Sequence, residues 1–323
     1  MGFRKYGICS STQFYLRNGP PPEGPPISNV LTFDIEDWRP LADEWIHGIR
    51  TEASGWVPRQ VEHIRRILDR HNTRATFFWL GWTAESHPAT VLALARDGHE
   101  IASHGYGHRP IYALTPDQFE ADVVKAQNTL ASITGQLPRG FRAPQFSITR
   151  KTWWAFSILT RLGFQYDSSI FPIRHRRYGV SDFERHICRI MTEHGPILEI
   201  PLATIAWRGF NFPVAGGGYF RVLPKAVLLS ALKRLNAEQL PFVTYFHPYE
   251  YDAGRLSLSL SASGIRLRAR MWLFEALQNL GRSTMPRKLE ALLTSARFEP
   301  CTKVLGTFLN KPLEKIGVLY GSR

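Results

Sequence analysis

The chain has 323 residues, of which 44% are hydrophobic and 12% aromatic, so a disordered protein is excluded and one large packed core is expected. The three cysteines, Cys9, Cys188 and Cys301, are far apart and form no C-x-x-C pair, which argues against a disulfide framework and a thiolate zinc site. The formal net charge of +13 requires a basic surface or an acidic partner.

Residues 1–29 end in a proline-rich run that resists helix and sheet, and they predict a flexible lead-in. Short apolar runs then alternate with helical patterns to residue 252. The predicted strands are 29–33, 75–80, 99–103, 140–143, 166–171, 197–205 and 241–246. The predicted helices are 61–71, 91–98, 115–134, 149–163 and 224–236. Such alternation indicates parallel pairing, and about seven units predict a closed or nearly closed α/β barrel over residues 30–252.

The pattern changes after Asp252. A serine-rich stretch is followed by two amphipathic segments, 271–280 and 287–298, so residues 253–323 are predicted to form a mostly helical extension packed on the barrel. This region holds twelve Lys and Arg against four Asp and Glu, a net charge of +8, and therefore most of the basic excess. Earlier, the run Gly216–Gly218 is interpreted as a tight turn that allows close backbone approach.

Three carboxylates, Asp34, Glu36 and Asp37, follow the first predicted strand within four positions. Charges this close repel one another, so keeping all three ionised requires a cation or a hydrogen-bond network. Strand alternation would place Glu36 on the same side as Asp34, whereas a turn that starts there would present Asp37 instead. An ordinary solvated turn at a strand end is the alternative.

Two histidines, His104 and His108, lie four positions apart in a loop that also contains Gly105 and Gly107. The glycines argue against a helix, but such a loop could turn both imidazoles toward one point. Two imidazoles and one carboxylate suit zinc or another divalent first-row metal with open positions for water and substrate. Two unrelated loop histidines are the simpler alternative, since the chain has eleven histidines.

Arg142 and His247 close two further predicted strands. A buried arginine needs a carboxylate, and its planar fork suits a paired aspartate such as Asp34. His247 is stiffened by Pro248 and lies at the same predicted edge, which makes it a candidate general acid. The alternatives are a structural ion pair for Arg142 and a satisfied strand-end histidine for His247.

The order and wording of these motifs resemble the polysaccharide deacetylases of the NodB-homology class, carbohydrate esterase family 4. The similar segments are LTFDIEDW, SHGYGHRPIY, GFRAPQFSIT, YDSSIFP and the stretches EIPLATIAWRGFNFPVAGGGYFRVLP and YFHPYEYD. They cover roughly residues 30–295 and are closest to the subgroup associated with exopolysaccharide gene clusters and exosortase systems. The resemblance implies a distorted (β/α)7 barrel of the NodB-homology type, followed here by the C-terminal helical extension.

The resemblance also implies catalytic roles. Asp34 would be the catalytic base, Arg142 would orient it, and His247 would protonate the leaving amine. The oxyanion would be held by the metal and by a backbone N–H near Tyr166 to Ser169.

The implied cofactor is a divalent metal, with Zn²⁺ as the first choice, bound by His104, His108 and either Glu36 or Asp37. Two departures matter. Many members have two adjacent aspartates where this chain has Asp-Ile-Glu-Asp, and many have a hydroxyl residue at the position of Gly105, where it steadies the histidine loop. Some relatives with the glycine-type motif act on ureides or small amides, and some need no metal.

The sequence therefore predicts a hydrolase that removes N-acetyl groups from an amino-sugar polysaccharide or oligosaccharide during exopolysaccharide biosynthesis. A same-fold hydrolase of a small ureide or cyclic imide and a non-catalytic carbohydrate-binding barrel are the alternatives. Five aromatic residues near the motifs could stack on sugar rings, with core packing as the alternative for each: Trp38, Trp45, Trp207, Tyr249 and Tyr251.

The basic C-terminal region has two interpretations, a solvated face or adhesion to an anionic membrane surface. No nucleic-acid module is recognisable, so nucleic acid is not an expected partner. No apolar run is long enough to span a bilayer, and no apolar signal region follows Arg4 and Lys5. The expected location is therefore the cytoplasm, with peripheral binding at the inner membrane face.

Overall fold

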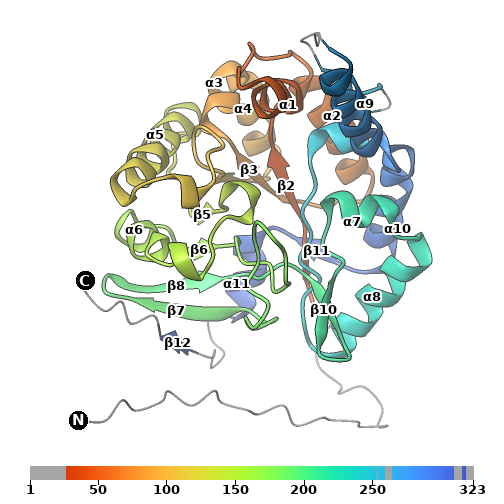
Figure 1. Ribbon diagram of the computed structural model, residues 1–323. Coiled ribbons are helices and arrows are strands. Elements are labelled where there is room, and N and C mark those ends of the chain that lie inside the picture. Colours follow the sequence, from red (N-terminus) through yellow and green to blue (C-terminus); the bar gives the residue numbers. More distant parts are fainter. Residues whose placement is uncertain (1–26, 253, 259–263, 309–314, 318–323) are drawn as a thin grey trace.

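The computed structural model describes residues 27–252, 254–258, 264–308 and 315–317, so nearly all of the predicted lead-in lies outside the described residues. An eight-stranded, mostly parallel sheet has the order β12-β7-β8-β6-β5-β4-β3-β2, and helices surround it (Figure 1). Its strands are β2 (Thr32–Ile35), β3 (Thr76–Trp79), β4 (Glu100–Ser103), β5 (Gly140–Phe141), β6 (Tyr166–Asp167), β7 (Cys188–Thr192), β8 (Gly195–Glu199) and β12 (Lys315–Gly317).

Residues 243–246 continue the wall beyond β2. Phe246 forms a parallel bridge with Phe33, and on the other side the Ala203 N–H donates to the Val243 carbonyl at 3.1 Å. Four backbone hydrogen bonds join residues 242–246 to residues 30–34, from Val30 N–H to the Phe242 carbonyl through Asp34 N–H to the Phe246 carbonyl, so the sparser pairing at this seam is confined to the side of Ala203. The six parallel strands β2–β6 and β8, together with residues 243–246, form a distorted α/β barrel, which confirms the predicted fold class.

The described helices are α1 (Trp38–His47), α2 (Val57–Arg70), α3 (Gly81–Ser86), α4 (Pro88–Arg96), α5 (Pro116–Thr134), α6 (Ala155–Arg161), α7 (Gly217–Val222), α8 (Lys225–Ala237), α9 (Ile265–Asn279), α10 (Met285–Ser295) and α11 (Cys301–Phe308). Helix α5 begins at the predicted capping box, in which the Thr115 hydroxyl accepts from the Gln118 N–H and the Gln118 side chain accepts from the Thr115 N–H. It ends at Gly135, whose φ of 76° favours glycine.

Two predicted elements are shorter than expected. The strand predicted over 166–171 ends at Asp167, because the Asp167 carboxylate accepts from the Ser169 N–H and hydroxyl and turns the backbone away from the ladder. The helix predicted over 149–163 is regular only in α6, since its first turn is a 3₁₀ turn over Arg150–Thr152.

The strand predicted over 197–205 is two strands, β8 and β9 (Thr204–Trp207), separated by a segment that contains Pro201. Proline has no N–H for a ladder, so pairing stops there. Strand β9 pairs with β10 (Phe210–Pro213) in a hairpin, and β7 pairs antiparallel with β8. Neither hairpin is predicted by the sequence.

The C-terminal extension shares the hydrophobic core of the barrel. Strand β1 (Asn29–Val30) pairs in parallel with β11 (Phe298–Glu299), and Leu289 and Leu292 of α10 belong to the same buried cluster as the barrel strands. The two regions therefore pack as one body, while the proposed division at residue 252 stays a prediction.

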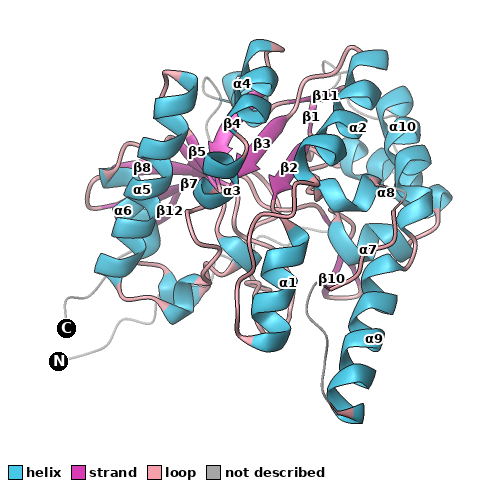
Figure 2. Ribbon diagram, turned by 90° about the horizontal axis from the view of Figure 1, so that it is seen from above, coloured by secondary structure: helices cyan, strands magenta, loops and turns pink. Residues whose placement is uncertain are grey.

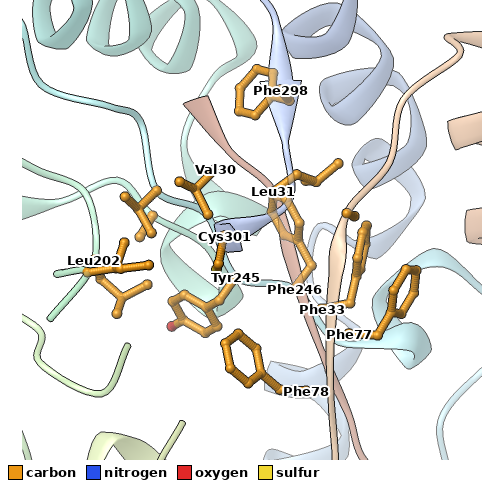
Figure 3. Packing of buried hydrophobic residues seen from close by; sticks show 14 of the residues in the cluster. Val30, Leu31, Phe33, Phe77, Phe78, Leu202, Tyr245, Phe246, Phe298 and Cys301 are labelled. Carbon is orange, nitrogen blue, oxygen red and sulfur yellow. The ribbon is translucent and has the colours of Figure 1, made fainter. Parts of the chain in front are cut away.

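Aromatic residues fill the centre of that cluster (Figure 3). The Phe33 and Phe77 rings stack with centroids 5.1 Å apart, and every residue of β2 and β3 is buried, as expected for strands covered on both faces. Gly216 bridges to Tyr245, and a Cβ there would lie 1.6 Å from the Tyr245 carbonyl oxygen. The predicted close backbone approach at the glycine run is thereby confirmed.

Candidate active site

The carboxyl ends of the barrel strands open into one cavity of about 710 Å³. The predicted site residues that line it are Asp34, Glu36, His104, His108 and His247. Each follows or ends a parallel segment, and parallel strands end at a common edge, which is why residues far apart in sequence meet there.

Asp34 lies on β2 with its carboxylate held from below by Arg142, which directly follows β5. The Arg142 Nη1 donates to Asp34 Oδ1 at 2.7 Å and to the Thr32 hydroxyl at 2.6 Å. Its Nε donates to the Ser168 carbonyl at 2.9 Å, and its Nη2 donates to the Ser168 hydroxyl at 2.8 Å. Both charges are buried, so Arg142 has one fixed orientation and fixes that of Asp34.

His104 and His108 meet at Glu36. Their Nε2 atoms lie 3.1 and 2.9 Å from the same Glu36 oxygen. Burial raises the pKa of the Glu36 carboxyl, but the facing imidazoles, His108 above all, hold that pKa well below its usual value. The His108 backbone has a φ of 56°, an uncommon conformation outside glycine that occurs at functional sites.

The three side chains fit a divalent cation, since one ligand atom from each lies within 4.8 Å of the others. The Nδ1–H of His104 donates to the Arg142 carbonyl at 2.7 Å, so the neutral imidazole keeps its lone pair on Nε2. That lone pair faces the Glu36 carboxylate at 3.1 Å, which is repulsive unless a proton or a cation joins the two atoms. Imidazole nitrogen and carboxylate oxygen are the donors that zinc and similar metals prefer.

Glu36, and not Asp37, approaches the histidines. The side-chain alternation of β2 extends to the residue after its end, so Glu36 lies on the same side as Asp34. This is the first of the two arrangements that the sequence allowed. Asp37 is more deeply buried than Glu36 but points elsewhere, where its carboxylate accepts from the Ser54 N–H and from the Ser54 hydroxyl, both at 2.6 Å. The structure therefore brings Glu36 to the candidate metal site and gives Asp37 a loop-anchoring position.

The histidine loop is held by Asp122 of α5. The Asp122 carboxylate accepts from the Tyr106 N–H at 2.7 Å and from the Gly107 N–H at 3.1 Å. Gly105 has a φ of 73°, and a Cβ there would lie 2.8 Å from Asp122 Oδ2. Glycine at this position thus makes room for a carboxylate that supports the loop in place of the hydroxyl group expected from the resemblance.

His247 reaches the cavity from the seam of the barrel and lies beside a buried acid. Its Nδ1 is 3.5 Å from Glu250 Oε2, an ion-pair distance, and the same oxygen accepts from the His247 backbone N–H at 2.9 Å, while Arg221 lies 3.4 Å from the other Glu250 oxygen. Burial alone would lower the pKa of His247, but the contact with Glu250 and the charges of Glu36, Glu250 and Asp34 raise it to about 9. The imidazole is therefore protonated at neutral pH.

Several expectations about the surroundings need revision. Of the backbone N–H groups near Tyr166 to Ser169, one of which was predicted to hold an oxyanion, that of Ser168 donates to the Phe141 carbonyl at 3.0 Å and that of Ser169 to Asp167 at 2.9 Å. Of the five aromatic candidates, three line the cavity: Trp38, Trp45 and Tyr249. Trp207 is exposed on the β9–β10 hairpin and Tyr251 is buried in the core, so neither of these two lines the cavity.

Three residues at the site escaped sequence reasoning, namely Asp122, Arg221 and Glu250. Only Glu250 had a local signal, because an acid three residues after His247 forms a capping-box pattern around Pro248. The other two depend on contacts between segments distant in sequence.

Comparison with known proteins divides the chain into two parts. Residues 24–166 match the family model described as polysaccharide deacetylase, and residues 168–306 match a domain of unknown function, DUF3473. A peptidoglycan deacetylase-like protein from Gibberella zeae is 40% identical over 113 residues, which cover 34% of this chain and 32% of the relative. The peptidoglycan-N-acetylglucosamine deacetylase of Bacillus cereus is 34% identical over 87 residues, 26% of this chain and 32% of the relative. The chain thus spans about a third of the length of these curated relatives.

Solved structures match over nearly the whole chain. A Mycobacterium smegmatis protein described as a polysaccharide deacetylase has a TM-score of 0.62 and 19% identity, covering 94% of this chain and 96% of its own. The Puue allantoinase has a TM-score of 0.57 and 16% identity, covering 91% and 95%. At such identities the likeness establishes the shared fold, and a fold that hosts both kinds of protein does not select the substrate.

Proposed function

We propose that the protein is a metal-dependent hydrolase of N-acetyl groups on an amino-sugar polymer or oligomer, because residues 24–166 match the family model described as polysaccharide deacetylase. The observation that carries the proposal is one cavity that combines three kinds of group. These are a carboxylate pinned by a buried arginine, a Glu–His–His set of cation ligands, and a histidine kept protonated by a buried acid.

Glu36, His104 and His108 would hold the metal, for which we propose Zn²⁺. When bound, such a cation lowers the pKa of water and polarises an amide carbonyl. Asp34 accepts the proton of the attacking water as general base. Arg142 keeps the Asp34 carboxylate in one orientation, which reduces the reorganisation needed for proton transfer.

His247 donates a proton to the departing amine nitrogen, the step that prevents return of the acetyl group. Its pKa of about 9 keeps it in the acid form at neutral pH, and Glu250 holds its ring in place. The base and the acid are thus assigned by their environments, a carboxylate in one case and a protonated imidazole in the other.

An N-acetylated glycan is the proposed substrate. The relatives named peptidoglycan deacetylase and chitin deacetylase support this class, and aromatic side chains on the cavity wall suit sugar rings. A role in exopolysaccharide biosynthesis is proposed from the motif resemblance of the C-terminal half.

Acetate release from chito-oligosaccharides, peptidoglycan fragments and N-acetylated exopolysaccharide, measured with added Zn²⁺ and after chelation, tests the proposal. Asp34→Asn is expected to lower kcat by about 10²- to 10⁴-fold. The matched control is Asp37→Asn, which alters an equally buried neighbouring carboxylate outside the cavity and should retain acetate release. Acetate release that survives Asp34→Asn, or that no substrate yields, contradicts the proposal.

The glycine-type histidine motif favours a second candidate, hydrolysis of a small ureide or cyclic imide. That enzyme would remain fully active after chelation and would cleave the small amide faster than any glycan. A non-catalytic carbohydrate-binding barrel is the third candidate, and it would bind saccharide equally well in wild type and Asp34→Asn while releasing no acetate.

We also propose an anionic membrane surface as a partner, with the protein in the cytoplasm and peripheral at the inner face. The support is the net charge of +8 carried by residues 253–323. Among the helices that the structure describes, none combines the length and the apolar character needed to cross a bilayer.

A further inference from the structure

Helix α9 has apolar side chains on two opposite faces. With 100° between successive residues, its inner face holds Phe274 and Gln278 against the body of the protein. The Phe274 ring stacks on Trp38 with centroids 5.9 Å apart, and the Gln278 carbonyl accepts a hydrogen bond from Arg221. This face accounts for how α9 is attached, and it leaves the opposite face unexplained.

The outer face is an apolar stripe without a partner in the described chain. Its members follow the spacing i, i+4, i+7, i+8, i+11, i+12 and i+15: Ile265, Ala269, Trp272, Leu273, Ala276, Leu277 and Leu280. The larger side chains are well exposed, Ile265 at 85% and Trp272 at 64%. A surface helix normally turns polar residues outward, so a continuous outward stripe indicates an interaction surface.

Arginines border this stripe on both sides. By the same 100° spacing, Arg268 and Asn279 lie along one edge and Arg270 lies along the other, while Arg266 lies between Leu273 and Leu277. The single acidic residue of α9, Glu275, is turned inward, where it accepts from the Leu258 N–H at 2.9 Å. The charges that border the outward apolar surface are therefore all cationic.

The stripe lies beside the mouth of the cavity. Figures 1 and 2 show α1 and α9 next to each other, and in Figure 2 both project from the same side of the barrel. The inner face of α9 contributes Phe274 and Gln278 to the cavity wall. Trp45 of α1 is 51% exposed and lies against Phe274 and Arg270, so it extends the apolar surface toward the cavity.

We propose that α9 is an interfacial helix that lies in the surface of an anionic lipid bilayer. Its stripe, with Trp272 along one edge, would enter the boundary between headgroups and acyl chains, while its three arginines contact lipid phosphates. A second copy of the chain fits this face less well, because a twofold pairing of stripes would bring the arginine edges of two copies together. A projecting single helix also offers a ridge that can sink into a bilayer.

Docking through α9 would place the cavity mouth at the membrane surface. The consequence that the enzyme deacetylates a glycan held at that surface rests on the proposed function, whereas bilayer binding itself does not. The two parts are therefore separable by experiment.

The test is flotation of the full chain with vesicles of phosphatidylcholine alone or mixed with phosphatidylglycerol. Wild type should bind the mixed vesicles, and Trp272→Ser with Leu277→Ser should weaken that binding at least tenfold. Arg266→Gln with Arg268→Gln should weaken it by about fivefold for each arginine removed. The matched control, Lys225→Gln with Lys233→Gln, removes the same charge from exposed positions of α8 and should leave binding near wild type.

Fluorescence gives a second readout. Lipids brominated on the acyl chain should quench wild-type tryptophan emission, and Trp272→Phe should lose that quenching. Equal losses in the α8 and α9 charge variants would reduce the effect to net charge and overturn the proposal. So would unaltered binding of the apolar variant, or a concentration-dependent dimer that Trp272→Ser abolishes.

Acetate release from a soluble chito-oligosaccharide separates this inference from the proposed function. All α9 variants should retain it, because their altered side chains do not line the cavity. Release without vesicle binding overturns only the interfacial helix, and vesicle binding without release overturns only the deacetylase.

Discussion

The two parts of the chain that match different family models build the site in different ways. Residues 24–166 supply the proposed base and cation ligands, whose positions are set by backbone hydrogen bonds between parallel strands. Residues 168–306 supply His247, which directly follows a segment bonded to β2, together with a buried pair of charges, Glu250 and Arg221, beside its ring. The first part thus sets the positions of most site residues, and the second part sets the protonation state of His247.

This contrast has an energetic basis. In the first part, the His104 N–H donates to the Trp79 carbonyl and the Arg142 N–H to the Ser103 carbonyl, so neighbouring strands hold each residue by its backbone. In the second part, Phe246 is held by backbone hydrogen bonds to Thr32 and Asp34 in the same way, but the charge of the following His247 depends on the neighbouring Glu250 side chain. Changes in the first part should therefore remove activity or stability, whereas changes in the second should move the pH dependence.

The largest effect is expected at Arg142. Arg142→Met removes one partner of a buried ion pair and should lower the free energy of unfolding by about 3–5 kcal/mol, because Asp34 is left as a buried charge without its cation. Urea denaturation measures the change. The exposed pair of Arg150 and Asp182 is the control, and Arg150→Met should change stability by less than about 1 kcal/mol. Similar losses for the two variants would show that Asp34 does not depend on Arg142.

Removal of a cation ligand should come next. Outer partners of metal ligands alone account for about 10- to 100-fold in affinity, so Glu36→Gln should weaken metal binding by more than about 100-fold. Asp37→Asn should bind metal like wild type, because its carboxylate contacts Ser54. Titration of the purified apoprotein with Zn²⁺ compares the two variants. Metal loss in Asp37→Asn and retention in Glu36→Gln would reverse the assignment.

The third prediction concerns pH. In the proposed mechanism His247 acts in its protonated form, and its pKa is raised to about 9, so activity should be present at neutral pH and fall as pH rises through that value. Glu250→Gln removes the neighbouring negative charge and should shift this alkaline limb down by about one pH unit or more. A bound cation repels the imidazolium in both proteins, so the difference between the two profiles is the quantity to measure. If the alkaline limb of the Glu250→Gln profile falls at the same pH as that of wild type, Glu250 does not raise the pKa of His247.

The same pair affects stability in a defined window. The raised pKa of His247 contributes stability that is fully present below the unfolded value near 6.5 and is lost as pH rises through about 9. The lowered pKa of Glu250 contributes stability that is present above its unfolded value near 4.5 and is lost at more acid pH. The contribution of this pair to the free energy of unfolding should thus be greatest between about pH 4.5 and pH 6.5. Glu250→Gln should flatten the dependence of that free energy on pH.

The sequence predicted those parts of the fold and the site that depend on local patterns. Strand alternation gave Glu36 as one of two possible carboxylates beside Asp34, the shared edge of parallel strands gathered the histidines, and the capping box marked the start of α5. It did not reach Asp122 or Arg221, because each acts on a segment that only the tertiary packing brings near. The two hairpins were missed for a related reason, since their short runs lack the helices that signalled the other strands.

The smallest effect is expected at Gly105 and tests whether Asp122 replaces the hydroxyl group of the resembling family. Gly105→Ser restores that hydroxyl, yet it should destabilise the protein by about 1–2 kcal/mol, because φ is 73° and the new Cβ would meet Asp122 Oδ2 at 2.8 Å. Gly135→Ser is the matched control, with a φ of 76° and no atom within 4 Å of its Cβ. The excess loss at Gly105 over Gly135, measured by thermal unfolding, isolates the contact with Asp122. An equal loss at both positions would mean that the carboxylate moves aside freely, and the histidine loop would then owe little to Asp122.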